Sequence, residues 1–258
     1  MIEIKKIIET SLEAGKAVME IYNSDDFNLE LKSDNSPLTR ADLTSHNLIK
    51  ENLSSLYPEI PILSEEGKDI EYDIRKNWQR FWLVDPLDGT KEFIKKNGEF
   101  TINIALIENN LPTLGIIYAP AFGNNLNNSG PFPGTLYYAE KSIGSFKQVA
   151  GDQPVNLPCL PYSGNVKAVR SRSHASPEEE EIYKKYLVKE TISVGSSLKF
   201  CMIAEGRAQI YYRHGPTNEW DVAAGYAISK YAGAEISGLS FNKKNLLNSS
   251  FLVKSEMG

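Results

Sequence analysis

Residues 82–90 read WLVDPLDGT, and this stretch decides how the chain is organised. Its apolar first half predicts a buried strand that leads directly into two carboxylates, Asp85 and Asp88. Pro86 restricts the preceding residue to an extended backbone, and Gly89 permits a sharp change of direction. We therefore expect the two carboxylates to converge at the end of the strand.

Two carboxylates that lie this close repel each other, and uncompensated burial would raise their pKa values. A bound cation relieves the repulsion, and oxygen donors with no His or Cys nearby favour Mg²⁺ over zinc or copper. Gly89 and Thr90 add backbone N–H groups and a hydroxyl where a helix can begin, which is an anion site. The stretch thus predicts a metal beside a phosphate, with a purely structural role as the alternative.

Two more acidic features lie outside this stretch. Glu65 and Glu66 follow the apolar run 60–63, and Asp221 opens a small-residue helix over residues 222–232. Each has a structural alternative. The glutamates can form a surface turn, and an acid at the positive end of a helix stabilises it by a few tenths of a kcal/mol to about 1 kcal/mol.

The rest of the chain alternates helix and strand patterns. Thr39 is a plausible N-cap, with Asp42 three positions later. The pattern predicts helices over 2–22, 38–56, 176–186 and 222–232, strands over 62–63, 81–84, 100–107, 114–119, 136–139, 166–170 and 210–212, and a long surface loop over 120–134. This alternation predicts a layered α/β or α+β sandwich.

Composition and charge narrow the class of protein. The chain has 258 residues, of which 41% are hydrophobic and 24% charged, as in ordinary globular proteins. A chain of this size can bury about three quarters of its unfolded surface, as one large domain or two intimate ones. With 28 basic and 33 acidic side chains the net charge is -5. No global cationic field exists, so we expect no nucleic-acid polymer as a partner.

Cysteine usage and hydropathy indicate the compartment. Cys159 and Cys201 are not in metal-ligand spacing, and both are expected to be small buried side chains in a reduced compartment. No apolar run approaches the roughly 18 residues of a membrane-spanning helix, and the first residues are too polar for a signal peptide. We expect a soluble, cytoplasmic protein.

Three motifs occur in a characteristic order: Glu65 followed by an acid, the DPLDGT of 85–90, and the WDVAAG of 220–225. Together they resemble the Mg²⁺-dependent, lithium-sensitive phosphatases that include inositol monophosphatase. Within that superfamily the chain looks most similar to the bacterial 3′(2′),5′-bisphosphate nucleotidases, on residues 32–42, 85–94, 171–174, 195–200 and 215–221. The continuation KEFIK at 91–95 discriminates, because inositol phosphatases usually carry Thr-Asn-Phe there.

The resemblance implies a five-layered α-β-α-β-α sandwich. It also implies an N-terminal α+β metal-binding half over residues 1–156 and a C-terminal α/β nucleotide-binding half over 157–258, with the metals between them. It implies two to three Mg²⁺ ions, held by Glu65, Asp85, the Leu87 carbonyl, Asp88 and Asp221. Four carboxylates and a phosphate dianion total about -6, which two to three divalent cations neutralise.

The resemblance also implies roles in catalysis and substrate binding. Asp42 and Thr90 would orient and deprotonate the attacking water, although Asp42 can instead be a capping residue. The implied substrate-binding residues are Glu65, Leu87, Asp88, Gly89, Thr90, His174, Ser196, Lys199, Arg213 and Asp221. His174 has a structural role as its alternative, and Arg213 can be a solvated strand-end charge. Glu66 could hold an additional water or a third metal, or face solvent.

The expected reaction is removal of the 3′-phosphate from adenosine 3′,5′-bisphosphate, giving AMP and phosphate. A second expected substrate is 3′-phosphoadenylyl sulfate, which would place the enzyme in sulfur metabolism, clearing a by-product of sulfate activation. The alternatives are an inositol or sugar phosphatase and a non-catalytic, Mg²⁺-dependent nucleotide sensor. Peripheral association with the inner face of the cytoplasmic membrane stays open, and the sequence predicts no oligomeric state.

Overall fold

The structure is a computed structural model that describes residues 2–24, 27, 29–31, 37–123, 133–150, 152–158, 164–172 and 176–255. Its helices are α1 (Ile4–Tyr22), α2 (Arg40–Leu56), α3 (Tyr72–Arg75), α4 (Thr90–Ile94), α5 (Pro177–Lys185), α6 (Leu198–Ala204) and α7 (Glu219–Tyr231). The described strands form two large sheets and two small two-stranded pairs, β1 (Glu30–Leu31) with β2 (Pro37–Leu38) and β13 (Thr217–Asn218) with β15 (Leu247–Asn248).

The larger sheet has the order β3-β4-β5-β6-β7-β8-β9. Its strands are β3 (Ile62–Ser64), β4 (Arg80–Asp88), β5 (Thr101–Glu108), β6 (Leu111–Ala119), β7 (Thr135–Glu140), β8 (Gly144–Val149) and β9 (Val155–Asn156). Only β3 and β4 are parallel neighbours, and the remaining pairs are antiparallel.

The smaller sheet has the order β11-β10-β12-β16-β14. Its strands are β10 (Lys167–Arg170), β11 (Glu190–Ser193), β12 (Ile210–Arg213), β14 (Glu235–Ser237) and β16 (Phe251–Lys254). Strand β10 pairs in parallel with both β11 and β12, whereas β16 pairs antiparallel with β12 and β14.

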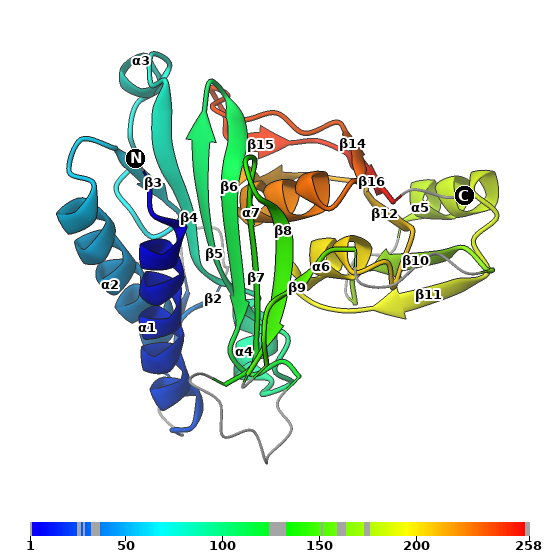
Figure 1. Ribbon diagram of the computed structural model, residues 1–258, viewed down its shortest axis with the longest axis horizontal. Helices are drawn as coiled ribbons and strands as arrows, with labels where there is room; N and C mark the ends of the chain where they lie inside the picture. The colour runs from blue at the N-terminus through cyan, green and yellow to red at the C-terminus, as the bar shows by residue number, and fades with distance from the viewer. Residues whose placement is uncertain are drawn as a thin grey trace.

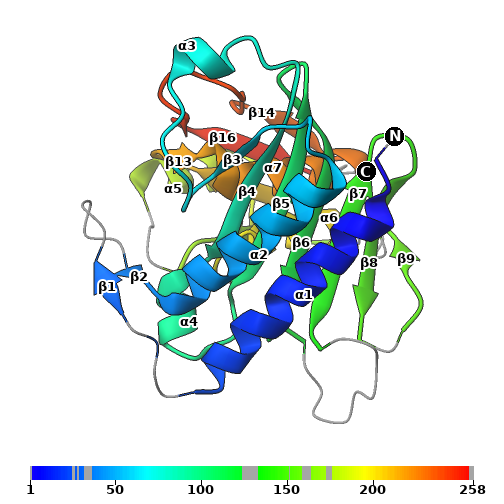
Figure 2. The same ribbon diagram turned by 90° about the vertical axis from the view of Figure 1, so that its left-hand side faces the viewer.

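The helices and sheets form five layers, seen edge-on in Figure 1. Helices α1 and α2 cover the outer face of the larger sheet, on the left of that view, and Figure 2 looks onto this helical layer. Helices α6 and α7 lie between the two sheets, and α5 packs on the outer face of the smaller sheet. The predicted α-β-α-β-α sandwich is confirmed.

Both faces of the central strands β4, β5 and β6 of the larger sheet are buried, and the alternation of their side chains explains how. On β6, Ile116 and Tyr118 belong to the apolar cluster that contains α1, whereas Ile117 and Ala119 belong to the cluster that contains α6 and α7. Successive strand residues point to opposite faces, so a sheet covered on both sides needs apolar residues at every position. Burying each large aliphatic side chain stabilises the fold by about 1.5–3 kcal/mol.

Helix α7 packs directly against the larger sheet, and small residues meet at the contact. A Cβ atom added to Gly115 on β6 would lie 2.6 Å from the Ala224 carbonyl oxygen and 2.8 Å from the Ala227 Cβ. On another side of the helix, a Cβ atom on Gly225 would lie 2.4 Å from ring atoms of Phe200. The small face predicted for this helix therefore sets its distance from the sheet.

The sequence predicted the longer elements, with different ends in places, and most of the short ones were not predicted. The strand predicted to end at Val84 continues to Asp88, and the helix expected from 222 begins at Glu219. The sequence analysis gave no bounds for α3, α4, α6, β1, β2, β8, β9, β11, β13, β14, β15 or β16. Of the loop expected over 120–134, residues 124–132 lie outside the described residues. The division expected at 156/157 follows the end of β9 and stays a prediction.

Two expectations about cysteines and membranes can be compared with the structure. Cys201 is a free, fully buried thiol, as predicted, and Cys159 lies outside the described residues. Among the described residues, no helix is both long enough and apolar enough to cross a membrane.

Candidate metal centre and substrate cavity

The end of β4 is bulged, and the bulge brings Asp85 and Asp88 to the same side. Residues three apart in a regular strand point to opposite faces. Here Asp85 pairs with Asn103 and Asp88 pairs with Thr101. Between these two pairs β4 contains one residue more than β5. A bulge of this kind re-aims a side chain and accommodates the proline that lies within it.

Glu65 is placed beside Asp85 by the parallel pairing of β3 with β4. Ser64 lies opposite Val84, and the backbone N–H of Glu65 donates to the Val84 carbonyl at 3.1 Å. The residues that follow this pair, Glu65 and Asp85, therefore bring their carboxylates side by side. Glu66 follows in the turn after β3 and is half-buried.

Asp221 reaches the same place from the first turn of α7. Its Oδ2 accepts a hydrogen bond from the Asn218 backbone N–H at 2.9 Å, in a capping box. Asp221 therefore does cap α7, as the structural alternative expected, and its side chain also belongs to the acidic cluster. One carboxylate oxygen from each of Glu65, Asp85 and Asp221 lies within 4.8 Å of the others.

The electrostatics of this cluster are those of a site built for a cation. Burial raises the pKa of Asp85 well above its usual range, and the charges of Glu65, Asp88 and Asp221 raise it further. Burial likewise raises the pKa of Asp221, followed by the charges of Asp88 and Glu65. Asp85 is buried, and the other carboxylates of the cluster are half-buried. Such a mutually repulsive group of oxygen donors fits a hard divalent cation, which offsets both the desolvation and the repulsion.

Asp42 and Thr90 are brought together beside the cluster. One carboxylate oxygen of Asp42 accepts from the Thr39 backbone N–H at 2.8 Å and from the Thr39 hydroxyl at 2.6 Å, which caps α2. The other, Oδ1, lies 3.2 Å from the Thr90 hydroxyl, which is also 3.3 Å from the Leu87 carbonyl. The two interpretations of Asp42 therefore do not exclude each other.

A cavity opens from the cluster towards the C-terminal half. Its lining includes six of the predicted substrate and metal residues: Asp88, Gly89, Ser196, Lys199, Arg213 and Asp221. Lys199 is buried, and desolvation lowers the pKa of its ammonium group despite nearby Asp88. Its Nζ donates to the Ser196 carbonyl at 2.5 Å. The cavity therefore combines cationic side chains with the acidic cluster.

Three polar atoms of this lining lack protein partners. Among the described residues, the Ser196 Oγ, the Arg213 Nε and the Thr217 Oγ1 are buried atoms with no hydrogen bond. A buried polar atom without a partner costs stability, so such atoms point to a polar ligand. Two of them belong to predicted residues. Thr217 and the cavity-lining Lys91 were given no role by the sequence analysis.

Other residues that the sequence analysis singled out or missed have clear positions. His174 lies outside the described residues, so its predicted contact with adenosine stays a prediction. Ser197, which lies next to a predicted residue, is 2% exposed and hydrogen-bonds to Asp88. A serine in a small-residue motif gives no signal of that contact, which depends on how α6 meets β4.

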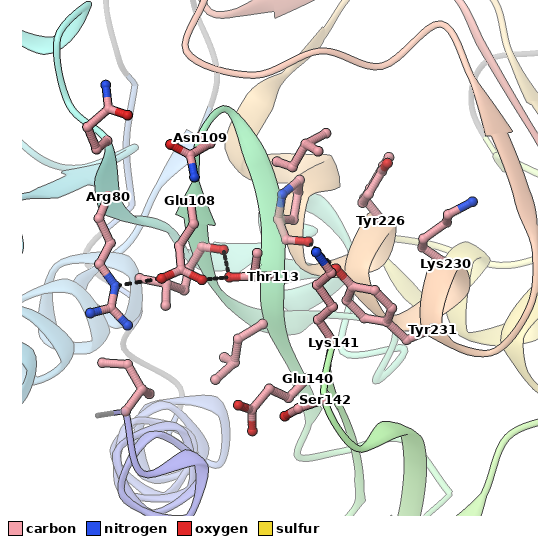
Figure 3. Close-up of a pocket in the computed structure, with 16 residues that line it drawn as sticks. Arg80, Glu108, Asn109, Thr113, Glu140, Lys141, Ser142, Tyr226, Lys230 and Tyr231 are labelled. Carbon is pink, nitrogen blue, oxygen red and sulfur yellow. Dashed lines mark hydrogen bonds and ion pairs between the residues drawn. The ribbon is translucent and has the colours of Figure 1, made fainter.

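A larger cavity, of about 1030 Å³ against about 170 Å³, lies at the other end of the larger sheet, where β4 begins (Figure 3). Arg80 pairs there with Glu108 at 3.0 Å, and Glu108 accepts from the Thr113 hydroxyl at 2.6 Å. Its lining contains none of the predicted site residues. Chemistry rather than size therefore identifies the candidate site.

The sequence pattern as a whole matches the model of one family. The inositol monophosphatase family model matches residues 3–257. The chain belongs to the inositol monophosphatase family. This membership confirms the resemblance inferred from the three motifs and accounts for the layered fold.

Relatives within the inositol monophosphatase family are similar over nearly the whole chain. The 3′(2′),5′-bisphosphate nucleotidase CysQ of Escherichia coli K12 is 44% identical over 234 residues, which cover 90% of this chain and 89% of the relative. CysQ of Haemophilus influenzae is 32% identical, covering 97% and 91%. The crystal structure of CysQ from Bacteroides thetaiotaomicron superposes with a TM-score of 0.83 at 39% identity, covering 98% and 97%.

Proposed function

We propose that this protein is a 3′(2′),5′-bisphosphate nucleotidase that hydrolyses adenosine 3′,5′-bisphosphate to AMP and phosphate, with 3′-phosphoadenylyl sulfate as a second substrate. The observation that carries the proposal is the similarity to CysQ nucleotidases over about nine tenths of the chain. The cavity supports it, because its lining combines the carboxylates Asp88 and Asp221 with the cations Lys199 and Arg213. A substrate with two separated anionic groups fits that arrangement.

The proposed cofactor is Mg²⁺, as two or three ions. Glu65, Asp85, Asp88, Asp221 and the Leu87 carbonyl would hold them, and the all-oxygen donor set and the raised pKa values support this choice. When bound, such ions neutralise the carboxylates and the phosphate and make water a stronger nucleophile.

The chain's own residues supply the positioning. Asp42 and Thr90 orient the attacking water. The water gives a proton to the Thr90 hydroxyl, and the Thr90 hydroxyl gives its own proton to Asp42 Oδ1, which lies 3.2 Å away. The water oxygen attacks phosphorus in line, and the bond between phosphorus and the 3′-oxygen breaks. The leaving oxygen takes a proton from solvent water to become the 3′-hydroxyl of AMP, and no covalent enzyme intermediate forms. Gly89, with Thr90 at the start of α4, offers backbone N–H groups to the phosphate.

The nucleotide would occupy the cavity beyond the phosphate. Ser196, Lys199 and Arg213 are proposed to hold the adenosine and its second phosphate, together with His174. The unpartnered Ser196 Oγ and Arg213 Nε support these contacts. The Asp42–Thr90 contact argues against a non-catalytic sensor, because nucleotide binding alone needs neither residue.

The test is phosphate release from adenosine 3′,5′-bisphosphate, inositol 1-phosphate and fructose 1,6-bisphosphate, each with Mg²⁺ and at equal concentration. We expect the highest kcat/KM with the nucleotide. A clear preference for either of the other two phosphates contradicts the proposal and favours an inositol or sugar phosphatase. Binding of the nucleotide without any phosphate release favours the sensor.

A further inference from the structure

Ser197 joins the Asp88 carboxylate to the backbone of the first turn of α7, which comes from a distant part of the chain. It precedes α6 and is 2% exposed. Its Oγ lies 2.7 Å from Asp88 Oδ2, at the end of β4, and 2.9 Å from the backbone carbonyl oxygen of Asp221, in the first turn of α7. A third partner, Asn103 on β5, places its Nδ2 2.8 Å from the same hydroxyl.

The donor and acceptor capacities of these groups fix the direction of each hydrogen bond. A carboxylate and a backbone carbonyl offer only lone pairs, so the single Ser197 proton is shared between Asp88 Oδ2 and the Asp221 carbonyl oxygen, with the nearer, charged Asp88 as its main acceptor. The Ser197 oxygen can then only accept from Asn103, whose side-chain NH₂ must face it. Asn103 is 1% exposed and lies opposite Asp85 in the sheet. The hydrogen bonds from Asn103 to Ser197 and from Ser197 to Asp88 therefore begin and end on β5 and β4, the strands that carry Asn103 and Asp88.

We propose that Ser197, held by Asn103, is a positioning residue of the metal centre. Its hydrogen bond to Oδ2 fixes the rotation of the Asp88 carboxylate, whose terminal torsion is otherwise broad. Its second contact ties that carboxylate to the helix turn that carries Asp221. One hydroxyl thus sets the spacing between groups from the two halves of the chain. The inference rests on the proposed function in taking the cluster as a Mg²⁺ site.

The experiment measures metal binding without substrate. Metal-free protein is titrated with Mg²⁺, and the rise in melting temperature gives an apparent dissociation constant. We expect Ser197→Ala to raise that constant by about 10–100-fold, the usual effect of removing a partner that orients a metal ligand. The matched control is Ser229→Ala. Ser229 is fully buried on α7, and its hydroxyl donates only to the Phe200 carbonyl, at 3.2 Å.

Two further measurements separate positioning from general destabilisation. Asn103→Ala removes the anchor and leaves the Ser197 hydroxyl in place, so it should also weaken Mg²⁺ binding, and it carries the test if Ser197→Ala does not fold. Turnover of Ser197→Ala should recover towards the wild-type kcat as Mg²⁺ is raised. A loss of turnover caused only by a disturbed fold would not be reversed by raising Mg²⁺.

Each outcome decides the inference. Apparent Mg²⁺ dissociation constants within twofold of wild type in both Ser197→Ala and Asn103→Ala would overturn it, and so would an equal weakening in Ser229→Ala. If added Mg²⁺ does not change the melting temperature of the wild-type protein, the metal assignment is overturned as well. Failure to hydrolyse the nucleotide, with Mg²⁺ binding intact in wild type and weakened in the two variants, overturns only the proposed substrate.

Discussion

At Asp42 the two carboxylate oxygens have different partners. One caps α2 through Thr39, and the other faces the Thr90 hydroxyl. A single side chain therefore stabilises a helix end and contacts Thr90, its partner in the proposed reaction. Because the contacts use different atoms, substitutions can separate their contributions to folding and to catalysis.

We expect Thr90→Ala to lower kcat by about 100-fold or more, with a smaller change in KM, because it removes a group that positions the nucleophile. Asp42→Asn should lower both kcat and the melting temperature, the latter through about 1 kcal/mol of lost capping. Steady-state kinetics and thermal melts measure the two effects. Ser176→Ala, which removes the cap of α5, is the control and should lower only the melting temperature. An Asp42→Asn protein that melts earlier but keeps its kcat would leave capping as the sole role of this residue.

Asp88 gives a second prediction at this scale. Asp88→Asn should lower turnover by at least about 100-fold, because losing a proposed metal ligand should cost no less than losing a partner of one. The metal-free melting temperature should not fall, since the substitution removes a charge that repels Asp85 and Asp221. Chelation should abolish wild-type activity, and Mg²⁺ should restore it.

The control for Asp88→Asn is Asp73→Asn. Asp73 is an exposed acid whose side chain pairs with Lys76, and its substitution should change neither turnover nor metal dependence. Near-normal turnover of Asp88→Asn at saturating Mg²⁺ would contradict the assignment of this carboxylate to the metal centre.

Among the elements, α7 has two tasks, since it packs on the larger sheet and presents Asp221. Its position depends on Gly115, whose hydrogen atom occupies the space that a methyl group would need. Helix α1 has a similar close contact on the opposite face of the sheet. There a Cβ atom on Gly15 would lie 2.1 Å from the Tyr118 ring.

We expect Gly115→Ala and Gly15→Ala to destabilise the fold by about 1–3 kcal/mol each through overpacking. Only Gly115→Ala should also lower kcat and weaken Mg²⁺ binding, because it pushes on the helix that carries Asp221. Denaturant unfolding and Mg²⁺ titration provide the comparison. Equal effects of the two substitutions on metal binding would show that α7 does not transmit its position to the site.

The sequence predicted the elements whose pattern is local. The period of α1 and the cap of α2 are visible in the residues themselves, and the order of the three acidic motifs led to the family. Apart from Lys199, the residues of α6 are apolar on every side because the helix lies between two sheets, so the segment shows no helical period. Likewise, β8 carries Lys147 and Gln148 among its six residues and lacks a clean alternation. The role of Ser197 depends on three elements that meet only in the folded chain.

For the whole molecule, the charged centre lies where β3, β4 and the first turn of α7 come together. Cations there would face four carboxylates and a phosphate, so the charge of each ion matters as much as its size. Li⁺ is close to Mg²⁺ in radius but carries half its charge. It can enter a weakly held Mg²⁺ position without neutralising the product phosphate.

We therefore expect submillimolar to low-millimolar Li⁺ to inhibit hydrolysis of adenosine 3′,5′-bisphosphate, with Na⁺ and K⁺ much weaker. Initial rates are compared at constant ionic strength and limiting Mg²⁺, because screening alone weakens binding of a charged substrate. Equal inhibition by the three ions would argue against replacement of a bound Mg²⁺.

The position of α7 in the chain also bears on how the protein is made. Strand β8 ends at Val149, whereas the helix that covers the inner face of the sheet ends at Tyr231, 82 residues later. At a synthesis rate of about 5–20 residues per second, the inner face stays without that cover on the ribosome for roughly 4–16 s. Ile117 and Tyr137 lie on this face. Until α7 emerges, these apolar side chains lack the helix that covers them in the folded protein, and the same helix brings Asp221, the last residue of the acidic cluster in chain order.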